Sequence, residues 1–555
     1  MRRALLAALV AGLLAAATPA TAPRAVSLVV VIVVDQLPAG KLEQVESRLS
    51  GGLRRFLKEG RRYTRCEHAH AATETAPGHA TLLSGLYPSH NGIVANDWHD
   101  VTAHRDVYCA ASASGGEGAA GPRNHDGTRA ATADQLDGEN LADLMKRFDP
   151  KSRVWSVAGK DRSAVLTAGH HPDGVFWFSQ KTGGFTANPA VVRELPSWGA
   201  EFWAADLAAT KLYRRLPDQW TYALRGDWGP DDVATESPTY SRVSPHPLMA
   251  AAPGAGADDT AAARARRIFT SPWVDWLTLQ LAGRILERAG LGDDASPDLL
   301  IVGLSGADAV GHSYGPDSQE YLDVLIHLDG WLGDFMDAAR RRGPVLFALS
   351  ADHGVLPLPE RVPGARRIPD QELPARLEKA AAARWSGRGA GPFIEAFNGT
   401  DVYLDRRALD RAGLTPAEAA EALKADLSSW PEVARVYTAA DLSKEPAPSD
   451  DLYVTLYRNR YRAGRSGDLS LQPCEKCLIT SRSEGTSHGS PYDYDRDVPM
   501  ILLGPGLRAG RDDAECRTVD LAPTLAAWLG LAFSDRRDGR PLPSALPVDS
   551  APPGK

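Results

Sequence analysis

The sequence predicts an α/β fold with a mostly parallel central sheet. Residues 28–34 (LVVVIVV), 299–304 (LLIVGL) and 345–349 (VLFAL) are short apolar runs rich in branched side chains. Runs of this kind are typical of strands that are buried on both faces. Two long segments with helical periodicity, 272–289 and 318–342, are predicted to be helices of the same domain.

The composition is that of a globular chain. Its 555 residues are 43% hydrophobic and 24% charged, which is ample material for a core. The length would permit several domains, but we expect one domain over residues 26–545 with insertions, as in many α/β enzymes of this size. The net charge of −8 and the scattered basic residues argue against a nucleic-acid-binding face.

Residues 1–22 have the pattern of a secretory signal. A basic start precedes an apolar run of roughly 14 residues and then small residues. We expect cleavage between Ala17 and Ala25, although Pro23 disfavours a cut directly after Ala22. The alternative is a membrane anchor, but the run is shorter than the ~20 residues that a span needs. We therefore predict a periplasmic or secreted protein with no membrane anchor after cleavage.

The five cysteines are too few for a disulfide scaffold, and their number is odd. Cys474 and Cys477 form a CEKC pair in a loop, which in an exported protein favours a local disulfide. A thioredoxin-like site would need a βαβ context, and a zinc site two more thiolates. Cys66, Cys109 and Cys516 could supply one more bridge, whose pairing the sequence leaves open.

The first strand, 28–34, is followed by Asp35. Open α/β sheets place ligand-binding groups just outside the carboxyl ends of their strands, so Asp35 is a candidate ligand. The alternative is that Asp35 only caps the following helix.

Residues 73–98 contain two further candidates. Thr75 is a hydroxyl nucleophile candidate in front of a Pro-Gly turn and a short helical run, and Asn96 is an amide in a loop. An ordinary loop threonine is the alternative for Thr75. Five histidines are expected to be packed or hydrogen-bonded rather than ligands, because ligand-like neighbours are absent at suitable spacing: His68, His70, His79, His90 and His99.

After a predicted surface loop at 100–135, a helix is expected at 136–148 and a strand at 153–158. Lys160 and Arg162 come just after this strand. Two cations so placed could clamp phosphate oxygens, the arginine as a fork and the lysine as a point charge. The alternative is a solvated turn.

Two insertions and a tail complete the predicted organisation. Residues 173–260 are rich in Trp and Tyr, and we expect an inserted cap over the site rather than part of the sheet. Residues 360–460 are expected to form a second insertion packed on the sheet edge, with helices and with short strands at 434–442 and 452–460. The Pro-rich residues 546–555 should be a flexible tail.

The later strands carry candidate metal ligands. Asp308 and His312 form a D-x3-H pair one helical turn apart, so both could bind a single metal ion. Asp352 and His353 are adjacent after the strand 345–349, and neighbouring side chains of an extended segment can serve two ions side by side. His488 lies between small residues before a final strand at 498–503 and a helix at 518–529, and a surface-loop histidine is its alternative.

Together these segments resemble the alkaline phosphatase superfamily, and within it the PafA-like phosphate-irrepressible phosphatases, which share a core with nucleotide pyrophosphatase/phosphodiesterases. The matching segments span almost all of the chain in family order: VVDQ, TAPGHAT, ANDW, GKDR, GADAVGH, SADHGV and GTSHGSPYDYDRDVP. The resemblance implies an α/β/α sandwich and two Zn²⁺ ions. One zinc would be held by Asp308, His312 and His488, and the other by Asp35, Asp352, His353 and the Thr75 oxygen.

The resemblance also implies a secreted, broadly specific alkaline phosphatase that hydrolyses small phosphate monoesters through a phosphothreonine at Thr75 and releases phosphate. Asn96, Lys160 and Arg162 would bind the phosphoryl oxygens. A Lys/Arg pair favours a monoester, whose extra anionic oxygen it can bind; the alternative is a phosphodiesterase or nucleotide pyrophosphatase. No C/S-x-P-x-R sulfatase motif stands at Thr75, and no serine matches that of the three-metal phosphatases. We expect a monomer.

Overall fold

The computed structural model describes residues 26–113, 121–226, 228–237, 241–250, 260–389, 391–444, 447 and 451–546. The predicted signal at 1–22 and the predicted tail beyond residue 546 lie outside these ranges. Among the described residues, no helix is both long and apolar enough to cross a membrane.

The central sheet has nine strands with β1 (Leu28–Val34) near its middle. β1 runs parallel to β10 (Asp298–Leu304) on one side and to β11 (Val345–Ser350) on the other. The remaining strands are β5 (Val154–Ala158) and β6 (Gly174–Phe178), both parallel to β10, then β7 (Phe185–Thr186), and on the other side β18 (Met500–Leu503), β2 (Arg61–Glu67) and β19 (Gly510–Arg517). The order is β19-β2-β18-β11-β1-β10-β5-β6-β7.

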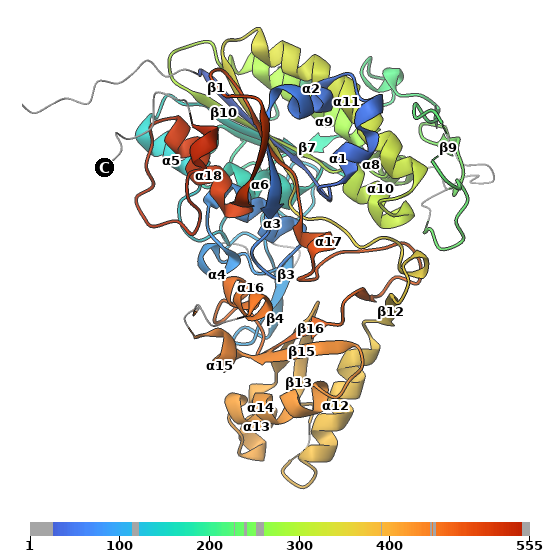
Figure 1. Cartoon of the computed structure of the whole chain (residues 1–555), viewed down its shortest axis with the longest axis vertical. Coiled ribbons are helices and arrows are strands. Elements are labelled where there is room, and N and C mark those ends of the chain that lie inside the picture. Colours follow the sequence, from blue (N-terminus) through green and yellow to red (C-terminus); the bar gives the residue numbers. More distant parts are fainter. Residues whose placement is uncertain are drawn as a thin grey trace, which may run out of the picture.

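Helices cover both faces of this sheet (Figure 1). In β1 the side chains alternate: Leu28, Val30, Ile32 and Val34 enter one core, and Val29, Val31 and Val33 enter the other. One face is covered by α2 (Gly52–Glu59), α9 (Trp273–Arg288), α10 (Gly306–Tyr314) and α11 (Gln319–Arg340). The other face is covered by α3 (Thr75–Ser84), α5 (Leu141–Phe148), α6 (Asp161–Ala168) and α18 (Leu521–Trp528). The predicted mostly parallel α/β/α sandwich is confirmed.

Two predicted boundaries differ from the structure. The helix expected at 136–148 begins only at Leu141, because Asn140 and Asp143 form a capping box at its start. The loop expected at 100–135 begins with a β-hairpin formed by β3 (Asp97–Asp100) and β4 (Arg105–Tyr108).

The Trp-rich segment 173–260 was predicted to lie outside the sheet, and for its first part this is wrong. It begins with β6 and β7 of the central sheet. Trp177 enters the core on the face covered by α3 and α6, and most other aromatic side chains of the segment join the core on the opposite face. There Phe176 stacks on Trp203 with ring centroids 5.4 Å apart, and Trp220 is fully buried. Apolar burial against β5 and α9 therefore determines where this segment lies.

The second insertion is a small subdomain with its own core, seen at the bottom of Figure 1. Its antiparallel sheet has the order β13-β14-β16-β15, so it extends beyond the predicted residue 460. The strands are β13 (Ile394–Asn398), β14 (Asp401–Leu404), β15 (Val433–Thr438) and β16 (Leu469–Pro473), and its helices include α12 (Glu372–Arg384), α13 (Arg406–Ala412) and α14 (Pro416–Leu427).

Two predictions for this insertion need correction. Residues 452–460 form helix α16 (Leu452–Arg460) rather than a strand, since Asp451 caps its N-terminus and Leu456, Tyr457 and Arg460 are buried along one side. The insertion was expected on the sheet edge, but α16 contacts α4 (Pro88–Asn91) and β13 contacts β3, beyond the carboxyl ends of the parallel strands. The predicted Cys474–Cys477 disulfide is present, and Cys477 is the first residue of β17 (Cys477–Thr480).

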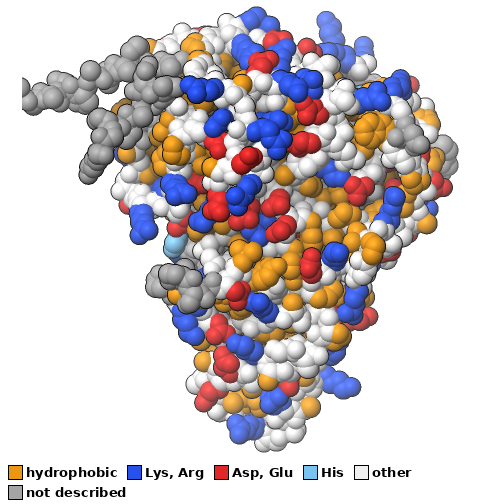
Figure 2. Space-filling model, in the orientation of Figure 1, with side chains coloured by type: hydrophobic (Ala, Val, Ile, Leu, Met, Phe, Trp, Pro, Cys, Tyr) orange, Lys and Arg blue, Asp and Glu red, His pale blue; other side chains and the backbone are white. Residues whose placement is uncertain are grey.

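On the face shown in Figure 2, basic and acidic side chains are interspersed. This distribution agrees with the scattered charges of the sequence.

Candidate active site

The predicted site residues meet at the carboxyl ends of β1, β10 and β11. Six of them line one pocket with a volume of about 390 Å³: Thr75, Asn96, Lys160, Arg162, His312 and His488. The other four, Asp35, Asp308, Asp352 and His353, are buried beside it. None of the described residues between 173 and 260 lines this pocket.

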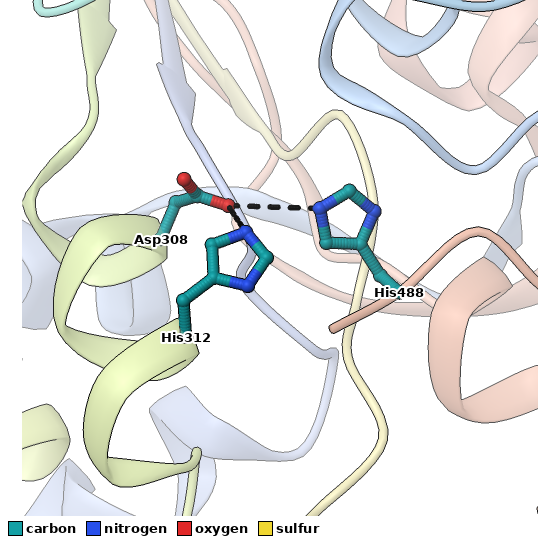
Figure 3. Close-up of side chains that lie close together, drawn as sticks. All are labelled: Asp308, His312 and His488. Atoms are coloured by element: carbon teal, nitrogen blue, oxygen red, sulfur yellow. Dashed lines mark ion pairs between the residues drawn. The ribbon is translucent and has the colours of Figure 1, made fainter. Parts of the chain in front are cut away.

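The first carboxylate and imidazole group is Asp308, His312 and His488 (Figure 3). Asp308 and His312 project from α10 one turn apart, and His488 comes from the loop before α17 (Asp493–Arg496). The Oδ1 atom of Asp308 lies 3.3 Å from Nε2 of His312 and 3.8 Å from Nε2 of His488. The three side chains thus present their ligand atoms to one point.

The second group is Asp35, Asp352 and His353. The Nε2 atom of His353 lies 3.5 Å from Oδ1 of Asp35 and 3.6 Å from Oδ2 of Asp352. The imidazole of His353 stacks on that of His488 with ring centroids 3.5 Å apart, so the two groups adjoin.

Each of the three histidines donates its Nδ1 hydrogen to a backbone carbonyl. The acceptors are Thr486 for His312, Thr73 for His488 and Gly354 for His353, at 2.9, 2.7 and 2.9 Å. This tautomer leaves every Nε2 with a free lone pair that faces the carboxylates, as in metal-binding histidines.

The second group fits a metal cation. Oδ1 of Asp35 and Nε2 of His353 are buried and have no hydrogen-bond partner among the described residues, which is unusual for buried polar atoms. Burial lowers the pKa of His353, and of His488 still further, so both imidazoles are held neutral. Burial and the nearby Asp308 and Asp352 carboxylates raise the pKa of Asp35 well above its usual range. A cation would relieve this repulsion.

Thr75 lies beside these groups at the first position of α3. Its Oγ1 is 3.2 Å from Nζ of Lys160 and 3.4 Å from Nη2 of Arg162. Gly78 allows this helix to approach closely, since a Cβ there would lie 2.1 Å from the carbonyl oxygen of Asp352. The N-terminal end of α3 therefore places the Thr75 hydroxyl beside the second group.

Asn96 is held next to Thr75 by two hydrogen bonds. Its backbone N–H donates to Glu74, and its Oδ1 accepts from the N–H of Ala76 at 2.9 Å. Because Oδ1 faces the backbone of α3, the Nδ2 amide remains available to another acceptor in the pocket.

Lys160 was predicted to bind phosphate, but its side chain also contacts carboxylates of both ligand groups. Its Nζ is 2.6 Å from Oδ2 of Asp35 and 2.5 Å from Oδ2 of Asp308, so it joins both groups. Burial alone would lower the pKa of Lys160, but Asp308 and Asp35 raise it overall. Burial is likewise outweighed at Asp308, whose pKa Lys160 and His312 hold well below its usual range.

Gln36 is a site residue that the sequence did not reveal. Its backbone N–H donates to Oδ1 of Asp352 at 3.0 Å, and its Nε2 donates to Oδ1 of Asp308 at 2.9 Å. It follows Asp35 directly, but no spacing rule indicates that one glutamine reaches both groups. His79 is packed and hydrogen-bonded as predicted, within α3 rather than beside a turn: its Nδ1 contacts the carbonyl of Thr75 at 2.9 Å and Asp352 at 3.1 Å.

The second insertion forms part of the pocket wall. Asn398, Gly399 and Thr400 of the β13–β14 turn and Arg460 of α16 line it. Arg460 pairs with Asp401 at 3.0 Å. The insertion thus helps to determine which molecules can reach Thr75.

Comparisons with known proteins find a phosphodiesterase-type family model and several alkaline phosphatases that this chain resembles. The family model described as Type I phosphodiesterase / nucleotide pyrophosphatase matches residues 29–494. Alkaline phosphatase PhoK of Sphingomonas sp. is 32% identical over 544 residues, covering 94% of this chain and 91% of that protein. Alkaline phosphatase PafA of Elizabethkingia meningoseptica is 30% identical over 557 residues, covering 97% of each. The crystal structure of wild-type PafA superposes with a TM-score of 0.83 at 28% identity, covering 95% of this chain and 99% of that one.

Proposed function

We propose that this chain, which belongs to the type I phosphodiesterase / nucleotide pyrophosphatase family, is a secreted two-zinc alkaline phosphatase that hydrolyses phosphate monoesters with broad specificity through a phosphothreonine. The chain is identified as a phosphoric monoester hydrolase by its relatives, which are alkaline phosphatases about 30% identical over nearly the whole chain.

One observation supports the proposed two-metal mechanism with a phosphothreonine most strongly. The Thr75 hydroxyl lies within 3.4 Å of two cations, Lys160 and Arg162, and beside two groups of carboxylate and imidazole ligands. A hydroxyl so placed is suited to attack an anionic phosphorus centre.

The two ligand groups would hold the metal ions. Three ligands of the Asp and His type suit zinc with an open position for substrate, and Thr75 would add its oxygen to the second group. When bound, two such ions supply Lewis acidity that stabilises charge on the attacking and leaving oxygens of an in-line displacement.

The chain's own residues account for the remaining steps. Thr75 Oγ1 forms a bond to phosphorus while the bond to the leaving oxygen breaks, and water then hydrolyses the phosphothreonine and releases phosphate. The Nδ2 amide of Asn96 and the side chains of Lys160 and Arg162 donate to the non-bridging oxygens, where charge is concentrated. A monoester has three such oxygens, whereas a diester has an organic group in place of one.

The second candidate is a phosphodiesterase or nucleotide pyrophosphatase, which the description of the matching family model favours. The two cations next to Thr75 favour the monoesterase. We also propose export to the periplasm or medium by the signal-like residues 1–22, a monomeric state, and small-molecule phosphate monoesters rather than nucleic acids as substrates.

Relative rates on p-nitrophenyl phosphate and bis-p-nitrophenyl phosphate test this proposal. The wild type should prefer the monoester strongly, and the Lys160→Ala/Arg162→Ala variant should lose roughly 10²-fold or more in kcat/KM for the monoester but far less for the diester. Thr75→Ala should lose both activities.

Because Lys160 also pairs with Asp35 and Asp308, Arg162→Ala alone should be measured, with metal content determined in parallel. Arg435→Ala is the matched control, since Arg435 is an exposed arginine that pairs with Asp451 and does not line this pocket, so its removal should leave the monoester preference unchanged. A wild type that prefers the diester would overturn the proposal in favour of the second candidate.

A further inference from the structure

Two buried cysteines face each other at one edge of the central sheet. Cys66 of β2 and Cys516 of the edge strand β19 are direct partners in the parallel pairing of these strands. Their side chains enter the same core and are 3% and 1% exposed. Their sulfur atoms lie 2.8 Å apart.

This arrangement suits a covalent bond. Neighbouring strands are about 4.8 Å apart, within the Cα–Cα range of roughly 4.4–6.8 Å that disulfides span. The two sulfurs already lie on the same face of the sheet, so bond formation needs only a small adjustment of the side chains. We propose that Cys66 and Cys516 form a disulfide bond that joins the edge strand β19 to β2 in the exported protein.

The assignment also accounts for the odd number of cysteines. Cys474 and Cys477 are already bonded to each other. Cys109 is fully buried in a different core, among residues of α3 and α6, and has no sulfur partner among the described residues. It would remain the single free thiol.

The bond would form by thiol–disulfide exchange with an oxidised dithiol or glutathione disulfide. The thiolate of one cysteine attacks the oxidant and forms a mixed disulfide; the second thiolate then attacks the bound sulfur and displaces the reduced oxidant as a thiol. Two cysteine protons and two electrons leave the protein in the process. A cavity of about 470 Å³ lined by both cysteines lies beside the pair.

The bond would restrain residues that contact the chain next to Asp352 of the candidate active site. Thr518 and His68 each lie two residues after one of the cysteines, Cys516 and Cys66. The hydroxyl of Thr518 donates to Nδ1 of His68 at 2.9 Å, and Nε2 of His68 donates to the carbonyl of Ala351 at 3.1 Å. Ala351 immediately precedes Asp352. Because the two cysteines are 450 residues apart in the chain, the bond would also close a very long loop and restrict the unfolded chain strongly.

Thiol counting tests the inference. The exported full-length protein is held in a glutathione redox buffer, then denatured without reductant and alkylated. We expect one modified cysteine per chain, Cys109, and after reduction all five, with a cross-linked peptide pair containing Cys66 and Cys516 in the unreduced digest. Three modified cysteines, or a bond from Cys109 to either partner, would overturn the proposal.

Heat denaturation provides a second readout that does not depend on activity. Reduction breaks the Cys474–Cys477 bond in the wild type and in the Cys66→Ala/Cys516→Ala variant alike. Only the wild type also loses the Cys66–Cys516 bond, so reduction should lower its melting temperature by several degrees more than that of the variant. Cys109→Ala is the matched control, because it removes an equally buried thiol and should keep the full response of the wild type. An equal response in all three proteins would contradict the bond.

Discussion

Gln36 connects the two candidate metal groups through two different atoms. Its backbone N–H reaches Asp352 and its side-chain amide reaches Asp308. The residue adopts a φ of 61°, in the left-handed region that is uncommon for glutamine. Gly311 makes room for its side chain, since a Cβ there would lie 2.0 Å from Oε1 of Gln36. We infer that Gln36 is a positioning residue for both carboxylates.

Replacement of Gln36 by methionine, which is nearly the same size but cannot donate, should weaken metal binding. Residues that orient metal ligands typically contribute about 10–100-fold to affinity. We expect a loss of that order for the ion at Asp308, His312 and His488, measured by competition with a zinc chelator rather than by turnover.

Gln44→Met is the control for this experiment, since Gln44 is an exposed glutamine of α1 (Lys41–Val45). An unchanged zinc affinity of Gln36→Met would show that the side-chain hydrogen bond to Asp308 does not matter for metal binding.

At this scale the sequence predicted residue types better than contacts. Asp35, Asp308 and Asp352 could be found because each follows a buried strand and carries ligand chemistry. The reach of Gln36 depends on a left-handed backbone, and the position of Lys160 between two carboxylates depends on how α6 packs against α3. Neither is encoded in local spacing.

Helix α10, which carries Asp308 and His312, is held at its N-terminus by Asp275 of α9. The N–H of Gly306 donates to Oδ1 of Asp275 at 2.9 Å. Burial raises the pKa of Asp275 to about 7, against the lowering effect of the hydrogen bonds from Gly306 and Ser305. A buried carboxyl therefore supports the element on which one metal group depends.

This raised pKa predicts a pH-dependent stability. The folded protein binds a proton at Asp275 at pH values where the unfolded chain has lost it, so stability falls as pH rises from about 4 to about 7 and is then constant. Asp275→Asn should lack this component. Between about pH 5 and pH 8, the free energy of unfolding of the wild type should fall by roughly 1–3 kcal/mol more than that of the variant.

Urea denaturation at both pH values measures the difference. Asp334→Asn, at an exposed position of α11, should follow the wild type. A parallel pH dependence in wild type and Asp275→Asn would contradict the raised pKa.

Among the elements, buried strands were the easiest to predict and amphipathic segments of the insertion the hardest. The apolar runs that became β1, β10 and β11 have only one stable environment, between two helical layers. Residues 452–460 are rich in Tyr, Val and Thr, which favour strands, but the Asp451 cap and burial of Leu456 and Tyr457 outweigh this preference in α16.

For the whole molecule, the site is assembled from almost the full length of the chain. Its ligands extend from Asp35 to His488, and the second insertion completes the pocket wall. The order of the motifs predicted this convergence. It could not predict that the Trp-rich segment contributes strands to the sheet, because its aromatic side chains would suit a cap or a core equally well. Metal binding should therefore be coupled to the folded state.

Metal content per chain tests the central claim, a two-metal site around Thr75, most directly. Protein equilibrated with zinc and then dialysed is examined by elemental analysis. The wild type should retain two ions, and His312→Ala/His488→Ala and Asp352→Ala/His353→Ala should each retain one. His90→Ala, outside both groups, should retain two. A wild type with one ion or none, or a double variant that keeps both ions, would contradict the account.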